Sequence, residues 1–480
     1  MNTHQIHLWI NNEDIQTATY AEVRDPGRLS EVVGKVANGS PDHVDQAVKA
    51  AYAAFQIWRD MDLQERSALL LQAADLLEQD APALAEILTR ETGAVIATHR
   101  AEVYTAAAAI RHAVEMAETF FKPKQYESDE GWISIEKRPV GVIAGIIPWN
   151  APMILLTQKI GPALVAGNTV VIKPSPNAPL AVSIALKKIS SLFPAGVINV
   201  VHGDGEVGSA LTTHPLVRKI SFTGGGATAK FVMKDAAASL KRVHFELGGN
   251  DPAILLDDVH VEDAIPKILT TAFRRSGQVC FAIKRVYIPE KLYDRVSELV
   301  CELVGKFTVG HGLDERATMG PVNNKMQYNY VQELVERAKK SKAKVVELGT
   351  KLDPDNWNNG YYLLPHIVMN PEPEQEIVTC EQFGPVLPLI AYRSEEEVIR
   401  LANNTEYGLG SSVWTSDFER ALRISRKIEA GMTFINQHGV SPFGYKYVPF
   451  GGVKQSGIGR ESGEEGMSEF IEYHAIDARK

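Results

Sequence analysis

Apolar and polar positions divide most of the chain into helical segments and short strand-like runs. A helical pattern opens at Ser40, where Pro41 and Asp42 suit a first turn, and helical patterns continue to about Phe121. Beyond this point, short apolar runs alternate with helix-like stretches at intervals of roughly 30 residues, the length of a βαβ unit. The alternation predicts a parallel sheet covered by helices. Its expected strands are VGVIAGI, NTVVIK, GVINVV, RKISFT and RVHFEL.

A second series of apolar runs follows Glu246 and again alternates with helical patterns, which predicts a second α/β domain. Its expected strands are PAILL, RVYIP, AKVVEL, VLPLIAY, SSVWT and MTFIN. Two further segments alternate like strands but belong to neither series: WISIEKRP, from Trp132, and the terminal EFIEYHAI. A lone two-stranded ribbon is marginal in water, so these segments are candidates for an arm that contacts a partner.

Size and charge narrow the class of protein. A chain of 480 residues exceeds what one hydrophobic core accommodates, so two or three domains are expected. The composition, 45% hydrophobic and 23% charged, is that of a globular protein. A formal net charge of -9, without a cluster of Lys and Arg, argues against nucleic acid as a partner.

The cysteine count and the N-terminus bear on the cellular compartment. Three cysteines make no disulfide framework and indicate a reducing environment. The N-terminal MNTHQIHLWINNEDIQ lacks the basic start and the apolar stretch of a signal peptide. The longest uncharged segment, residues 140–158, contains Pro148, Asn150 and Pro152, which indicates buried protein rather than a membrane span. We therefore expect a cytoplasmic protein that does not bind membranes.

Unusual residues follow the expected parallel strands at the ends where such sheets bind ligands. These are IPWN, KPSP, TGGG and ELGGN. The run GGGATA, residues 224–229, matches the G-x-G-x-x-G/A dinucleotide pattern, and N–H groups at the helix start after Thr223 would face a pyrophosphate. Taken alone, this pattern would make Glu246 a ribose-binding acid.

The segment AFRRSGQVC places a small turn before Cys280, and this is where a resemblance becomes specific. GQ-x-C, with ELGGN and IPWN upstream and EQFGPV and PFGGVKQSGIGRE downstream, resembles the signature segments of the aldehyde dehydrogenase superfamily over essentially the whole chain. The resemblance implies an α/β fold of two Rossmann-like parallel-sheet domains plus a small β oligomerisation arm. It also implies oxidation of an aldehyde to a carboxylic acid, with NAD or NADP as the hydride acceptor and no metal.

The chemistry of these residue types agrees with the implied reaction. A thiolate adds readily to an aldehyde, so Cys280 would form a thiohemiacetal and then a thioester. By resemblance, the Asn150 amide and the Cys280 N–H hold the oxyanion. Glu246 occupies the family position of the general base that deprotonates water, which replaces its reading as a ribose ligand and favours hydrolysis over transfer to coenzyme A.

The resemblance also assigns cofactor contacts. Lys173 would reach the adenosine ribose, Glu381 would hold the nicotinamide ribose, and Phe383 would pack beside it. Pro176 stands where the family often has a glutamate that excludes a 2'-phosphate, so the choice between NAD and NADP stays open. Gly225 replaces a frequent serine, and Ala229 replaces a usual glycine. The complete set of expected cofactor residues is Ile146, Pro148, Trp149, Lys173, Ser175, Pro176, Gly205, Gly208, Phe222, Thr223, Gly224, Gly225, Leu247, Gly248, Glu381 and Phe383.

The expected domains follow from the same alignment of motifs. The dinucleotide-binding domain would comprise residues 1–121 and 141–246, and the catalytic domain residues 247–445. The arm would comprise residues 122–140 and 462–480. Family members are homodimers or tetramers in which such an arm extends the sheet of another subunit, so a homo-oligomer is expected.

The substrate is specified less closely than the reaction. By resemblance, Ala151, Leu155, Gln158, Arg274, Phe281 and Phe450 line the tunnel for the aldehyde. Arg274 favours an acidic aldehyde, such as a semialdehyde, unless it simply faces solvent. Lys159 and Glu461 match a family pair proposed to pass the proton to solvent; the alternative reading is a lysine on a helix surface and a glutamate in a loop. Cys301 and Cys380 are expected to be bystanders.

Two alternatives belong to other classes of function. A cysteine-dependent esterase or acyl transferase would cleave esters without a redox step and without a nicotinamide cofactor. A catalytically silent structural protein on the same scaffold would do neither. The intact set of Cys280, Glu246 and Asn150 counts against the silent protein. Reduction of the cofactor on addition of an aldehyde would indicate the dehydrogenase, and ester cleavage that does not depend on nicotinamide would indicate the esterase.

Overall fold

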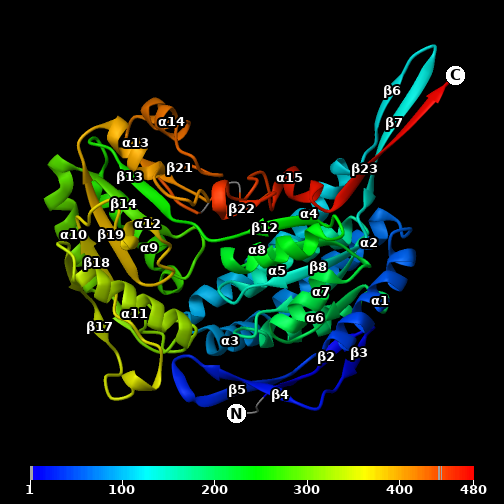
Figure 1. The fold of residues 1–480 in the computed structure, drawn as a ribbon, viewed down its shortest axis with the longest axis horizontal. Coiled ribbons are helices and arrows are strands. Elements are labelled where there is room, and N and C mark those ends of the chain that lie inside the picture. Colours follow the sequence, from blue (N-terminus) through cyan, green and yellow to red (C-terminus); the bar gives the residue numbers. More distant parts are fainter. Residues whose placement is uncertain (1–3, 440, 442–443, 445) are drawn as a thin grey trace.

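A computed structural model describes residues 4–439, 441, 444 and 446–480. Two large sheets, each covered by helices, lie beside one another, and an antiparallel ribbon projects from the body next to the first sheet (Figure 1). The C-terminus lies at the tip of this ribbon, far from the N-terminus. Among the described residues, no helix has both the length and the apolar character needed to cross a bilayer.

The first sheet has eight strands in the order β22-β12-β11-β8-β9-β10-β2-β3, and its five central strands are parallel. All five coincide with runs predicted from the sequence, which confirms the expected parallel sheet. The central strands are β8 (Val142–Ile147), β9 (Thr169–Pro174), β10 (Ile198–Val200), β11 (Val217–Thr223) and β12 (Arg242–Glu246). The antiparallel edges are β2 (Leu8–Ile10), β3 (Glu13–Ile15) and β22 (Gly457–Ile458).

Helices cover both faces of this sheet because each presents an apolar stripe to it. Trp58, Ile110, Ile143 and Ile160, all at most 1% exposed, belong to one core shared by helices and strands. The crossover helices are α5 (Pro152–Val165), α6 (Leu180–Ser190), α7 (Gly205–Thr213) and α8 (Gly226–Ala237). The predicted helical region comprises α1 (Pro41–Trp58), α2 (Leu63–Gln79), α3 (Ala81–Thr92) and α4 (Ile96–Phe120), and it is confirmed.

The strands before Ser40 were not predicted. Besides β2 and β3, this segment forms a small sheet in the order β1-β5-β4, made of β1 (His4–Ile6), β5 (Arg28–Ala37) and β4 (Tyr20–Asp25). Polar and charged residues interrupt these strands, and several positions in β4 and β5 are exposed. No continuous apolar run marked them, so the sequence pattern did not reveal them.

The second sheet has seven strands in the order β16-β18-β19-β14-β13-β20-β21, and only β16 is antiparallel. This confirms the second α/β unit. Its strands are β13 (Asp251–Leu255), β14 (Ile283–Pro289), β16 (Lys344–Glu347), β18 (His366–Met369), β19 (Val386–Tyr392), β20 (Ser412–Trp414) and β21 (Phe434–Ile435). Its helices are α9 (Val261–Phe273), α10 (Tyr293–Gly305), α11 (Lys325–Lys339), α12 (Glu376–Thr379), α13 (Glu395–Asn403) and α14 (Phe418–Ser425). A two-stranded sheet joins β15 (Thr308–Val309) and β17 (Thr350–Lys351).

The projecting ribbon consists of β6 (Lys124–Glu127), β7 (Gly131–Pro139) and β23 (Ile471–Arg479). Strands β7 and β23 pair antiparallel along their whole length, from Ile471 opposite Pro139 to Arg479 opposite Gly131. The segments WISIEKRP and EFIEYHAI therefore form the expected arm. Immediately before β23, α15 (Gly463–Ser468) packs against α4 and α5 instead of extending the ribbon. The division of the chain into domains by residue number stays a prediction.

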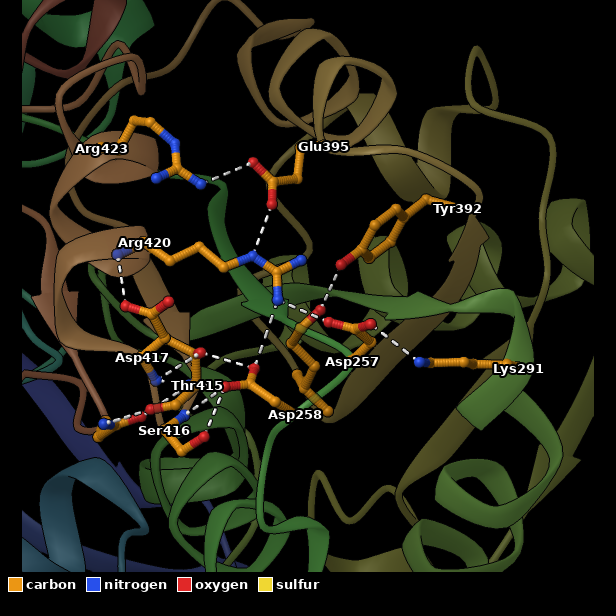
Figure 2. A network of polar contacts seen from close by, with 12 residues as sticks. Asp257, Asp258, Lys291, Tyr392, Glu395, Thr415, Ser416, Asp417, Arg420 and Arg423 are labelled. Carbon is orange, nitrogen blue, oxygen red and sulfur yellow. Dashed lines mark hydrogen bonds and ion pairs between the residues drawn. The ribbon is translucent and has the colours of Figure 1, made fainter.

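A polar network centred on Arg420 joins α14 to the loop after β13 and to α13 (Figure 2). The Arg420 guanidinium donates to Asp257 Oδ1 and to Glu395 Oε1, both at 2.6 Å, and it lies 3.6 Å from Asp258. Hydrogen bonds from Lys291 and Arg420 lower the pKa of Asp257 to about 2. Arg420 therefore holds together three carboxylates from two segments of the chain.

Replacing Arg420 by Ala leaves these three carboxylates facing one another without their common cation. We expect Arg420→Ala to lower the free energy of unfolding by about 2 kcal/mol. Urea denaturation followed by circular dichroism measures the loss, which should shrink at high salt because screening weakens the repulsion. Arg423→Ala is the control, since Arg423 makes one 3.5 Å contact with Glu395 and its side chain is 56% exposed. Equal losses in both variants would contradict the central role of Arg420.

Candidate active site

The ends of the central strands of the first sheet collect the polar residues that the sequence analysis singled out. Asn150 follows β8, Lys173 is the last residue but one of β9, Thr223 ends β11, and Glu246 ends β12. Because these strands are parallel, their carboxyl ends meet at one edge of the sheet. Cys280 and Glu381 come from the second unit, in the segments before β14 and after α12. The candidate site therefore lies where the two sheets meet.

Cys280 follows a sharp turn formed by the short helix η1 (Arg274–Gly277). Arg275, Ser276 and Gly277 all have positive φ, at 52°, 58° and 77°. Gly277 is required here, because a Cβ atom would lie 2.1 Å from the Gly384 carbonyl oxygen. The turn presents Cys280 to a cavity of about 530 Å³. Burial raises the pKa of the Cys280 thiol above its ordinary value.

The same cavity is bordered by Asn150, which is 8% exposed. The Asn150 side-chain amide donates to the Gln278 carbonyl at 3.0 Å, and this bond ties it to the Cys280 turn. All six residues expected to line the substrate tunnel border this cavity: Ala151, Leu155, Gln158, Arg274, Phe281 and Phe450. The thiol and the amide thus face the same space.

A buried cluster of charged side chains, which the sequence analysis missed, supports the part of the cavity that Asn150 borders. Arg275 donates to Glu102 Oε2 at 2.6 Å and to the Asn150 carbonyl at 2.9 Å. Glu102 also accepts from His99, and from the Met153 N–H at the start of α5. Although burial would raise the pKa of Glu102, Arg275 and His99 lower it to about 2. The cluster connects the Arg275 turn, Asn150 and the start of α5. Its only local signal in the sequence was the pair of arginines in the apolar context AFRRSGQVC.

Glu246 is 1% exposed, and neither of its carboxylate oxygens has a hydrogen-bond partner among the described residues. Burial raises its pKa well above the ordinary value, and the nearby Glu461 raises it further. Strand β22 pairs with β12 and places Gly457 opposite Glu246, so the run PFGGVKQSGIGRE returns to this point. The negative charge of Glu246 adds to the effect of burial in raising the pKa of Cys280.

Next to Glu246, Lys159 and Glu461 form a buried ion pair. Lys159 Nζ lies 2.6 Å from Glu461 Oε1 and 2.7 Å from Thr223 Oγ1, and both charged side chains are 2% exposed. They are therefore not surface residues, and the alternative reading of this pair as solvated side chains was wrong. The second oxygen of Glu461 has no partner among the described residues.

The edge between β9 and α7 has the properties of a nucleotide pocket. Lys173 is buried to 7% exposure, and this burial lowers its pKa to about 8 although Asp204 opposes the shift. Gly208 lies beside the Lys173 side chain. A neighbouring cavity of about 360 Å³ is lined in part by Pro174, Pro176, His202, Asp204 and Glu206.

The start of α8 presents unobstructed backbone. A Cβ atom built on Gly225 or Gly226 meets nothing within 4 Å, so space is open at this helix N-terminus, where N–H groups favour phosphate. On the facing unit, Glu381 Oε1 accepts from the Gly249 N–H at 3.0 Å, and Trp149 packs edge-to-face on Phe383 with ring centroids 5.5 Å apart. Together, an ammonium, a helix N-terminus, a carboxylate and aromatic rings are groups that fit a nicotinamide dinucleotide.

The other two cysteines do not belong to this site. Cys301 and Cys380 are free thiols, and neither borders the cavity of Cys280. Within the described ranges, no group of three or more His, Cys, Asp or Glu side chains could hold a metal ion. Taken together, the two parallel sheets and the residues at their junction define an α/β oxidoreductase that uses a nicotinamide dinucleotide.

Comparison with known proteins identifies the family. The model described as the aldehyde dehydrogenase family matches residues 9–476. The mouse protein named cytosolic aldehyde dehydrogenase 1 is 36% identical over 479 residues, covering 98% of this chain and 94% of its own length. Glutarate-semialdehyde dehydrogenase of Pseudomonas putida is 35% identical over 469 residues, covering 97% of this chain and 95% of its own.

Solved structures agree. Betaine aldehyde dehydrogenase of Staphylococcus aureus, in complex with NAD+, superposes with a TM-score of 0.94 at 31% identity and covers 98% of this chain and 94% of its own. A structure described as an E. coli NADP dependent enzyme has a TM-score of 0.94 at 31% identity and covers 99% and 98%. The chain belongs to the aldehyde dehydrogenase family. It is an enzyme that oxidises an aldehyde to a carboxylic acid with NAD or NADP as the cofactor.

The electrostatics of Cys280 predict how the free thiol reacts. Because burial raises its pKa, little thiolate is present near neutral pH in the enzyme without cofactor. Alkylation of Cys280 by iodoacetamide, followed by peptide mass mapping, should therefore accelerate continuously from pH 7 to about pH 9.5. A plateau below pH 8 would show that a cation overcomes the effect of burial. Denatured protein, in which the thiol is solvated, supplies the reference profile.

Proposed function

We propose that Cys280, Asn150 and Glu246 divide the steps of aldehyde oxidation among them. The observation that carries this assignment is that Cys280 and Asn150 border one cavity, while the charge of Glu246, a buried carboxylate without a hydrogen-bond partner among the described residues, raises the pKa of Cys280. The Cys280 sulfur forms a bond to the aldehyde carbon, and the carbonyl oxygen becomes an oxyanion. A bound dinucleotide supplies the acceptor for the hydride that leaves this carbon. The remaining acyl group is a thioester on Cys280.

The oxyanion needs fixed donors in a place from which water is excluded. The Asn150 amide and the Cys280 N–H are suited to this role, because the contact of Asn150 with Gln278 sets it beside the Cys280 turn. The Arg275 bond to the Asn150 carbonyl holds the same residue from the other side. Loss of one such donor typically costs about 3 kcal/mol of transition-state stabilisation.

Hydrolysis of the thioester requires a base that takes a proton from water. Glu246 suits this step, because a carboxylate with a raised pKa is a stronger base than a solvated one. Water adds to the acyl carbon, Glu246 receives its proton, and the carbon–sulfur bond breaks to release the carboxylic acid. The adjacent Lys159–Glu461 pair offers a route for the proton away from Glu246.

The same proposal assigns the cofactor contacts. Lys173 would bind the adenosine ribose hydroxyls, Glu381 the nicotinamide ribose, and the N-terminus of α8 the pyrophosphate. Ser175 and Pro176 follow Lys173 at the end of β9, and Gly205 and Gly208 lie in α7. The other contacts would come from strand ends and loops at the junction: Ile146, Pro148, Trp149, Phe222, Thr223, Gly224, Gly225, Leu247, Gly248 and Phe383. With Pro176 in place of a carboxylate, both NAD and NADP are compatible with the pocket.

The division of labour is tested by separating formation of the thioester from its hydrolysis. We expect Glu246→Gln to retain a burst of cofactor reduction of about one equivalent per site and then to turn over 10² to 10⁴-fold more slowly, roughly the contribution of a general base. Cys280→Ala should show neither burst nor turnover. Stopped-flow absorbance of the reduced nicotinamide measures both. A Glu246→Gln variant with normal steady-state turnover would refute the role of Glu246.

We further propose that the enzyme prefers acidic aldehydes. Arg274 borders the cavity of Cys280, and a guanidinium pairs well with a carboxylate. Glu102 also borders the cavity, but the guanidinium of Arg275 already compensates its charge, so it does not cancel this attraction. The similarity to a glutarate-semialdehyde dehydrogenase is consistent with this substrate class.

The charge preference can be measured as a ratio of kcat/KM values for a semialdehyde and an uncharged aldehyde of equal length. Arg274→Gln should lower this ratio by roughly tenfold, the value of one charge-assisted hydrogen bond, and leave the uncharged aldehyde largely unaffected. Tyr104→Phe alters the same cavity without changing its charge and should preserve the ratio. No preference for the charged series in the native enzyme would refute the proposal.

Assembly and location follow from the arm and the thiols. We propose a homo-oligomer, a dimer or tetramer, in which the ribbon of β6, β7 and β23 pairs with another subunit, because β6 is exposed throughout. A cytoplasmic location is supported by three free cysteines and by the similarity to a mouse protein named cytosolic.

A further inference from the structure

Lys284 is a buried cation beside Cys280 that none of the assigned roles uses. It lies in β14, four residues after Cys280, with 3% of its side chain exposed. Its Nζ donates to the Val279 carbonyl at 2.8 Å and to the Cys280 carbonyl at 2.7 Å. The same atom lies 3.3 Å from Glu381 Oε1. An ammonium has three N–H donors, so these partners use all of them.

The contact with the Val279 carbonyl determines where the Cys280 N–H points. The two groups belong to one peptide unit, and no peptide bond in the described chain is cis. In a trans peptide the carbonyl and the N–H point in opposite directions. Val279 O also accepts from the Ala282 N–H at 3.1 Å. Lys284 and Ala282 together therefore fix the direction of the Cys280 N–H, one of the two proposed oxyanion donors.

The next two carbonyl groups, those of Cys280 and Phe281, are also held in place. Gly249 packs against the Cys280 carbonyl so closely that a Cβ atom would lie 2.7 Å from its oxygen. The Phe281 carbonyl contacts His438 Nε2 at 2.8 Å. Three successive carbonyls, at 279, 280 and 281, thus have side-chain partners in the interior. The segment carrying the nucleophile has little freedom to rotate its peptide groups.

Lys284 also affects the charge balance around the thiol. Glu246, Glu381 and Asp251 all raise the pKa of Cys280, whereas Lys284 lowers it and partly offsets the effect of burial. His438 Nε2 lies 3.4 Å from Asp251 Oδ2 and so contacts one of these carboxylates. Without Lys284, the thiol would keep the effect of the three carboxylates and lose the cation that lowers its pKa.

We propose that Lys284 is a positioning residue, which orients the Cys280 N–H toward the developing oxyanion and ties the Cys280 segment to the cofactor-side carboxylate of Glu381. This role rests on the proposed function of Cys280 as nucleophile. Lys284 touches no reacting atom. It acts through the carbonyls of Val279 and Cys280 and through its charge.

The test uses the full-length enzyme without cofactor, so that the readouts do not depend on hydride transfer. Lys284→Met keeps the length of the side chain and removes its charge and its donors. Two quantities are measured: the pH profile of iodoacetamide alkylation at Cys280, and the rate of acylation by p-nitrophenyl acetate, which needs the same nucleophile and oxyanion donors. We expect the alkylation profile to move to higher pH and the acylation rate at a fixed thiolate fraction to fall at least tenfold.

Tyr287→Phe is the matched control. Tyr287 is buried in the same strand, and its hydroxyl donates to the Leu401 carbonyl at 3.1 Å, so the variant removes a buried polar group without reaching Cys280. Both readouts should stay within twofold of the native enzyme. Cys280→Ala should abolish both, and if acylation persists there, the function proposed for Cys280 fails rather than the role of Lys284.

Two results would overturn the role of Lys284 while leaving Cys280 as the nucleophile. One is an unchanged acylation rate and alkylation profile in a folded Lys284→Met. The other is a shifted alkylation profile with unchanged acylation at equal thiolate fraction, since Lys284 would then act by charge alone. If Lys284→Met does not fold, Lys284→Gln replaces it, because Gln is uncharged, is one bond shorter and has two N–H donors in place of three. Its alkylation profile must shift and its acylation rate must fall, or the proposal is wrong.

Discussion

The removal of charged groups from water at the junction of the two sheets is the constraint on which the site depends. Isolating one ion in a protein interior costs several kcal/mol, so each must be compensated by a partner. Arg275 compensates Glu102, Lys159 compensates Glu461, and Lys284 compensates Glu381. Each of these pairs also joins segments far apart in the chain. The same contacts that make burial tolerable therefore fix the relative positions of the reacting groups.

Glu246 is the exception among these carboxylates. It is as deeply buried as Glu102, but its oxygens accept no hydrogen bond from the described residues and His244 Nε2 lies 3.7 Å from Oε1, so its pKa is raised where that of Glu102 is lowered. The difference arises from a cation: Arg275 donates directly to Glu102, whereas Lys159 near Glu246 is bound to Glu461 and Thr223. A fully paired carboxylate is a poor base, so the lack of a hydrogen-bond partner at Glu246 suits the role of general base proposed for it.

The parts of the fold and site that could be predicted are those whose signal is local. Continuous apolar runs marked the parallel strands, and the segments around Cys280, Asn150 and Glu246 carried their own motifs. The strands before Ser40 were missed because polar residues interrupt them. Arg275 and Glu102 were missed for another reason: the paired arginines in AFRRSGQVC were the only local signal, and Glu102 lies 173 positions from Arg275. Lys284 likewise looked like an ordinary residue until its three contacts were visible.

The distribution of the site over both sheets explains why its motifs are spread along the whole chain. The first sheet supplies Asn150 and Glu246, and the second supplies Cys280 and Glu381, so neither unit by itself contains all three groups proposed as nucleophile, oxyanion donor and base. The segment after the second sheet closes this arrangement by returning Gly457 to the edge of β12 and Glu461 to Lys159. Catalysis in this enzyme therefore requires correct packing between the units as well as within them. The buried ion pairs at the junction serve that packing because a misplaced unit would leave their charges without partners.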